Sequence, residues 1–208
     1  MKNKKKTLLV IVAALLVFLT VGGTVAWLTR TSSVTNSFTV GEFSEPTTSP
    51  LDATQSINID GNLYEPSWTP DTKIYPGATI AKDPYVGIGP GSESGIVYVY
   101  VQNNFSNKVY FTINTGWEAV ANETVAGTGA NSYTSGIFKY TAGLTGSATD
   151  DVWTTTPLFS NILVDDAANT TDLDVNSKTI VVKSFIHQTS TGESDANILA
   201  AAKAAFNS

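Results

Sequence analysis

The hydrophobic pattern at the start of the chain has three parts. Four lysines within the first six residues precede an apolar run, residues 7–21, in which only two threonines are polar. Small residues follow and end at Ala26. This layout is typical of a secretory signal peptide over residues 1–26, and we predict cleavage between Ala26 and Trp27. The alternative is an uncleaved anchor over residues 7–28, since about 20 residues can span a bilayer. In both cases the positive end stays inside and the body faces outward.

After the signal peptide the pattern changes to alternation, which is typical of a half-buried strand. The residues that share one face, and the glycine that follows, are Val34, Asn36, Phe38, Val40 and Gly41. A strand near a free N-terminus can complete the sheet of its own domain or that of a neighbouring molecule. We therefore divide the chain into the signal peptide, an N-terminal extension with a candidate donor strand over residues 27–43, and one domain over residues 44–208.

Further along, the clearest strand covers residues 95–103, where valines alternate with larger residues. A turn over residues 103–107 and a second alternating run over residues 109–113 predict a β-hairpin. Further strands are predicted over residues 56–59, 136–140, 159–164 and 179–188. Residues 121–135 are rich in Gly and Thr, a composition that predicts a long surface loop. Ser194 is a suitable N-cap for one Ala-rich C-terminal helix.

These elements predict a mainly β fold, an antiparallel jelly-roll-type β-sandwich with a short C-terminal helix. Loss of residues 1–26 would remove four of the twelve Lys and Arg residues and none of the eighteen acidic ones. The acidic remainder argues against binding to nucleic acid, which needs clustered basic residues. Cysteine is absent, so disulfides, thiol catalysis and cysteine metal sites are excluded.

Candidates for catalysis are few. His187 is the one histidine, and neither an H-E-x-x-H nor a G-x-S-x-G motif occurs. We therefore predict no catalytic residue, no metal site and no cofactor. Acidic pairs could supply oxygen ligands to Ca²⁺, but their spacing matches no known calcium loop and favours solvated loops. The pairs are Asp150 with Asp151, Asp165 with Asp166, and Asp172 with Asp174.

The segment GGTVAWLTRTSSVTNSFTVGEF, residues 22–43, resembles the start of the TasA/camelysin family of Gram-positive biofilm matrix proteins. Those chains have a Gly-Gly-x-x-Ala signal end, a Thr/Ser/Asn-rich spacer and then Phe-x-x-Gly. Here Phe38, Val40 and Gly41 hold the matching positions. Residues 75–86 and 180–188 resemble the family's Pro-Gly turn and last strand, although His187 replaces a residue that is often small or aliphatic.

The resemblance implies a secreted, non-enzymatic subunit of extracellular fibres, found in the matrix or at the cell surface. It further implies head-to-tail polymerisation in which the N-terminal segment of one subunit adds as a donor strand to the next. The expected partners are other copies of the chain, with minor fibre or cell-wall anchoring proteins. No nucleic acid is expected, and membrane contact is limited to the signal segment.

Two alternatives belong to other functional classes. One is a monomeric surface adhesin or glycan-binding module, for which Trp68, Trp117 and Trp153 could form an aromatic platform. The other is a camelysin-like surface metalloprotease, which the missing zinc motif disfavours.

Overall fold

The computed structural model describes residues 29–33, 36–38, 43–69, 72–126, 129–174 and 178–207, with side chains from Phe43 onward. The predicted signal peptide lies outside these ranges, as do both residues of the predicted cleavage site, Ala26 and Trp27. Three residues of the predicted donor strand, Val34, Val40 and Gly41, lie outside them as well. The cleavage site therefore stays a prediction.

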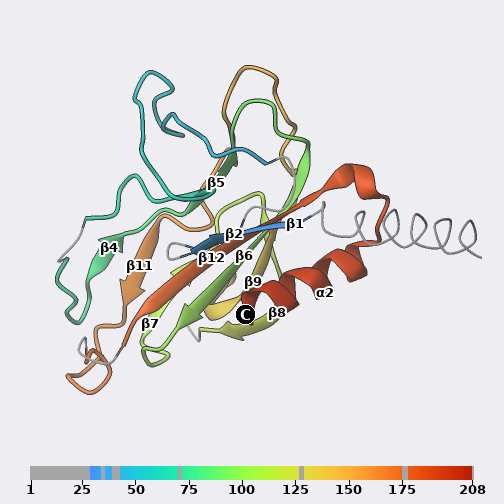
Figure 1. Ribbon diagram of the computed structural model, residues 1–208. Coiled ribbons are helices and arrows are strands. Elements are labelled where there is room, and N and C mark those ends of the chain that lie inside the picture. The colour runs from blue at the N-terminus through green and yellow to red at the C-terminus, as the bar shows by residue number, and fades with distance from the viewer. Residues whose placement is uncertain are drawn as a thin grey trace, which may run out of the picture.

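The expected mainly β, antiparallel fold with a short C-terminal helix is confirmed (Figure 1). Among the described residues, the larger sheet has nine strands. In spatial order they are β2 (Asn36–Phe38), β1 (Thr29–Ser33), β12 (Ile180–Gln188), β6 (Gly95–Asn103), β9 (Ser132–Tyr140), β7 (Val109–Thr112), β11 (Asn161–Val164) and β4 (Thr79–Ala81), with β8 (Trp117–Val125) also paired to β9. The smaller sheet contains β10 (Val152–Trp153), β5 (Tyr85–Ile88) and β3 (Leu63–Tyr64). The chain ends in a 3-10 turn, η2 (Thr189–Thr191), and helix α2 (Asp195–Phe206).

Strand β6 separates two apolar cores because its side chains alternate between the faces of the sheet. Val97, Val99 and Val101 are fully buried in the main core, which also contains Phe111, Phe138 and Phe159. Tyr98 belongs to the second cluster, between the sheet and α2. This α2-side core consists of Tyr98, Ala121, Ile137, Phe185, Ile198, Ala202 and Phe206. The sheet is therefore covered on both faces where β6 and β12 pair.

Strand β9 changes partners at Gly136. One edge of β9 pairs with β8 along its length, while the other pairs with β6 through residues 136–139 and with β7 through residues 132–133. Gly136 has a φ of +150°, and a Cβ there would lie 2.8 Å from the Cα of Glu123. Only glycine tolerates this combination of backbone angle and close approach. Gly136 thus marks the point where β9 passes from one partner to the next.

Three details of the predicted strands are wrong. Strands β6 and β7 do not form a hairpin, because β9 pairs with both of them. Residues 121–135, predicted to form a loop, belong largely to β8 and β9. Most of β8 is exposed and its pairing with β9 shifts register at three places, so it carries little hydrophobic alternation. Within residues 56–59, only Ser56 makes a β-bridge, to Thr48.

Helix α2 begins where the sequence predicts. The Ser194 side chain accepts a hydrogen bond from the Asn197 backbone N–H, and Asp195 lies in the first turn, near the positive end of the helix dipole. Ile198, Ala202 and Phe206 are the buried residues of the helix. Figure 1 shows α2 lying beside the sheet after the turn at η2. No helix in the described ranges combines the length and apolar character required to cross a bilayer.

Candidate functional site

The candidate site is the edge of β12 that faces β1. On its other edge, β12 pairs with β6 through all nine residues, from Ile180 with Asn103 to Gln188 with Gly95. On the candidate edge it pairs with β1 through five residues, from Lys183 with Ser33 to His187 with Thr29. In Figure 1 the two N-terminal strands are the blue arrows beside β12. The N-terminal segment therefore adds to a sheet edge through main-chain pairing.

The predicted donor residues Asn36 and Phe38 lie in β2, which pairs with β1 and not with β12. Phe38 is opposite Thr31, and Asn36 is opposite Ser33. The strand in contact with β12 is β1, with the sequence TRTSS, which lies within the predicted extension over residues 27–43 but before its alternating residues. It has no apolar residue, so hydrophobic periodicity could not reveal it; only the β-propensity of its threonines was available as a signal.

Side chains hold β12 in place from both faces of the sheet. Val182, Ser184 and Ile186 are buried, and the two apolar residues among them belong to the main core. On the α2 side, the ring of Phe185 lies 6.2 Å from that of Phe206 in an edge-to-face arrangement. Lys183 Nζ donates a 3.1 Å hydrogen bond to the carbonyl oxygen of Phe206. Strand β12 is thus fixed by packing on both faces of the sheet.

His187 is a packed residue at the end of this edge. Its side chain is 3% exposed, and Nδ1 lies 2.9 Å from the carbonyl oxygen of Gln188. Nε2 lies 3.8 Å from Oε2 of Glu193. Within the described ranges, no three His, Asp or Glu side chains are grouped in a way that could hold a metal ion. The geometry gives His187 a role in packing between β12 and the connection to α2.

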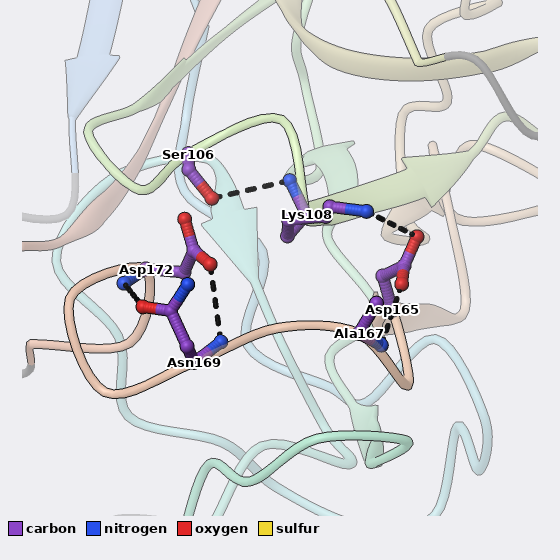
Figure 2. A network of polar contacts seen from close by, with 6 residues as sticks. All are labelled: Ser106, Lys108, Asp165, Ala167, Asn169 and Asp172. Carbon is purple, nitrogen blue, oxygen red and sulfur yellow. Dashed lines mark hydrogen bonds and ion pairs between the residues drawn. The ribbon is translucent and has the colours of Figure 1, made fainter.

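The acidic loop residues bind protein donors (Figure 2). Asp165 accepts a 3.1 Å hydrogen bond from Lys108 Nζ and a 2.7 Å hydrogen bond from the backbone N–H of Ala167. Asp172 accepts a 3.0 Å bond from the backbone N–H of Asn169, whose side-chain oxygen in turn accepts from the backbone N–H of Asp172. These carboxylates therefore fasten the loop after β11 to itself and to the turn before β7.

The same contacts lower the pKa of both carboxyl groups. The backbone hydrogen bond from Ala167 is the main cause for Asp165, and that from Asn169 is the main cause for Asp172. A carboxyl group whose pKa is lower in the folded state stabilises the fold above its unfolded pKa, about 3.9, and loses this effect as the pH falls through the folded value.

We therefore expect thermal stability to decline as the pH falls below about 4. The decline should be smaller in the double variant Asp165→Asn, Asp172→Asn, which has no charge to lose at these positions. Calorimetry between pH 7 and pH 2 measures both profiles, and the pH 7 values give the cost of the substitution itself. Parallel profiles for the two proteins would contradict the assignment.

The three tryptophans do not behave as one aromatic platform. Trp117 is buried and its Nε1 donates to the carbonyl oxygen of Thr156 at 3.2 Å. Trp153 is half-buried and its Nε1 donates to the carbonyl oxygen of Thr48 at 3.1 Å. Trp68 is 41% exposed, with Lys82 Nζ 4.8 Å from its ring centroid. Of the three, Trp68 alone is an exposed residue.

Comparisons with models of known protein families, with curated proteins and with solved structures return no match for this chain.

Proposed function

We propose that this protein is a secreted structural subunit of extracellular fibres. In this proposal, the N-terminal strand of one subunit adds to β12 of the next, and the repeated contact builds a homopolymer. The observation that carries the proposal is the pairing of β1 with the edge of β12 through five residues. Main-chain pairing of this kind gives affinity without requiring a particular side chain, so a second copy can supply the same strand.

The connection between the extension and the body supports an exchange. Among the residues whose side chains the structure describes, from Phe43 onward, the body forms two cores that extend to Phe206. Exchange of a terminal strand between identical chains replaces each intramolecular pair by an equivalent intermolecular one. Donor and acceptor surfaces differ, and such a head-to-tail contact forms an open filament unless its rotation closes a ring.

The first test compares the mature protein, beginning at Trp27, with a variant that lacks residues 27–41. We expect filaments of the mature protein in electron microscopy and a folded monomer of the truncated variant, because the acceptor edge remains but the donor strand is gone. Circular dichroism and sedimentation check folding and size. Filaments from the truncated variant would refute donor-strand assembly.

A synthetic peptide of residues 27–41 provides the complementary test. It should bind the truncated variant at the vacated edge and compete with full-length protein during assembly. The matched control carries proline at both Thr31 and Ser32. Successive residues of a strand direct their N–H groups to opposite edges, so at least one lost donor would face β12. Equal binding of both peptides would argue against pairing at this edge.

A further inference from the structure

An apolar cavity lies at the start of β12, beyond the point where β1 ends. It has a volume of about 290 Å³. Its apolar lining comes from Trp68, Ile74, Ile80, Phe105, Ile162 and Ile180. Lys178 and Thr179, which directly precede β12, also line it. Among the described residues, Ile180, Val181 and Val182 pair with β6 on one side and have no strand partner on the other.

The register of β1 leads directly to this cavity. Ser33 lies opposite Lys183 in an antiparallel pair, so each further residue of a straight strand would pair with the preceding residue of β12. Continued without a turn, the strand would place Asn36 opposite Ile180 and Phe38 opposite Lys178. In the structure the chain reverses instead, and Phe38 is opposite Thr31.

A straight strand would also match the alternation of the sequence. Residues directly opposite each other in a sheet share a face. Val182 is in the main core and Ile180 lines the cavity, so the row that contains Val34, Asn36 and Phe38 would face the same way. In the hairpin, Phe38 occupies the row of Thr31, which is opposite Phe185 on the α2 side.

Chain length prevents the straight arrangement within one molecule. Phe43 is 2% exposed and packs near Gly95, which pairs with Gln188 at the far end of β12. At about 3.3 Å per residue, the position opposite Lys178 is roughly 33 Å along the strand from Gln188. Five residue steps, from Phe38 to Phe43, span at most about 18 Å. Phe38 of the same chain therefore cannot reach this position, whereas Phe38 of another copy can.

We propose that in the fibre the donor strand of a neighbouring copy runs straight past Ser33 and anchors Phe38 in this cavity. The inference rests on the fibre function proposed above and adds the anchoring residue and its site. An aromatic ring suits a cavity with Trp68 and Phe105 in its walls. A single chain cannot carry this pairing as far as Lys178, and the additional pairs favour assembly over the closed hairpin.

Cross-linking tests the register, because the chain has no cysteine of its own. The straight register places Ser37 opposite Thr179, and paired strands bring Cα atoms within the range that a disulfide can bridge. The double variant Ser37→Cys, Thr179→Cys should form a ladder of disulfide-linked oligomers on a non-reducing gel after oxidation. The variant leaves Phe38 in place. Each single variant is a control for random coupling.

A second pair of cysteine substitutions distinguishes a failure of the straight register from a failure of strand exchange. Ser32 lies opposite Ser184 both in the hairpin and in a straight donor strand. A ladder from Ser32→Cys, Ser184→Cys without one from the Ser37 and Thr179 pair would overturn the straight register and support strand exchange. A Ser32 and Ser184 disulfide that closes only within monomers would overturn exchange itself.

The anchor is tested by Phe38→Ala and Phe38→Leu. Loss of a buried phenylalanine ring should raise the minimum concentration for filament formation about tenfold or more, and leucine should restore most of the loss. Unchanged assembly of Phe38→Ala would overturn the anchor. Binding of a soluble polysaccharide that Trp68→Ala abolishes, with assembly of Phe38→Ala unchanged, would assign the cavity to a glycan instead.

Discussion

Phe111→Ala is expected to lower the free energy of unfolding by about 3–5 kcal/mol. Phe111 is fully buried, and its ring lies 4.5 Å from that of Phe159 and 5.6 Å from that of Phe138. The truncation leaves a cavity and removes aromatic contacts from the main core. Since a domain is stable by about 5–15 kcal/mol, the loss is a large part of the total.

Chemical denaturation of the monomeric, truncated variant measures this loss without interference from assembly. Tyr75→Ala is the matched control, because Tyr75 is 59% exposed and its truncation should change stability by about 0.5 kcal/mol or less. Similar losses for the two variants would show that Phe111 does not lie at the centre of the core.

Ala202→Asp is expected to release α2 from the sheet. Ala202 is 0% exposed and lies in the α2-side core with Tyr98 and Phe185. A carboxylate in this position would be buried without a partner, at a cost of about 3–5 kcal/mol. The helix should therefore separate from the sheet and expose the apolar residues beneath it. Increased binding of a hydrophobic dye, together with a lower melting temperature, would report the exposed surface.

Ala200→Asp is the matched control, with the same substitution on an exposed position of the same helix. Both variants carry the same small loss of helix propensity, so their difference isolates burial. Because Lys183 of β12 bonds to the C-terminal end of α2, we also expect Ala202→Asp to weaken filament assembly more than Ala200→Asp. Equal effects of the two substitutions would contradict the packing of α2 against the acceptor sheet.

Some elements could be predicted because the burial of one face of a strand or helix leaves apolar residues at regular intervals in the sequence. The alternating valines of β6 predict their strand correctly, and Ser194 correctly predicts the start of α2. Strand partners could not be predicted in the same way. The alternation that identifies β7 records that one face is buried, but it does not record that β9 separates β7 from β6.

At the candidate site, too, hydrophobic alternation predicts strands but not their partners. The alternation around Phe38 predicts a strand there, but the strand that pairs with β12 is the polar segment before it. Edge pairing uses the backbone, and backbone hydrogen bonds leave no trace in hydrophobic periodicity. The acceptor strand β12 was predicted from its own pattern, whereas its open start and the adjacent cavity depend on contacts between distant segments.

The pairing of β12 has a mechanical consequence. One edge of β12 is joined to β6 by nine residue pairs, and the other is joined to β1 by five. In a single subunit pulled by its N-terminal strand, the five-pair ladder carries the load with fewer hydrogen bonds and separates first. A pull of this kind would detach β1 and leave β12 in the sheet, with the main core still closed. The hairpin contact within one subunit would thus yield before the body unfolds, and the freed edge of β12 could pair again.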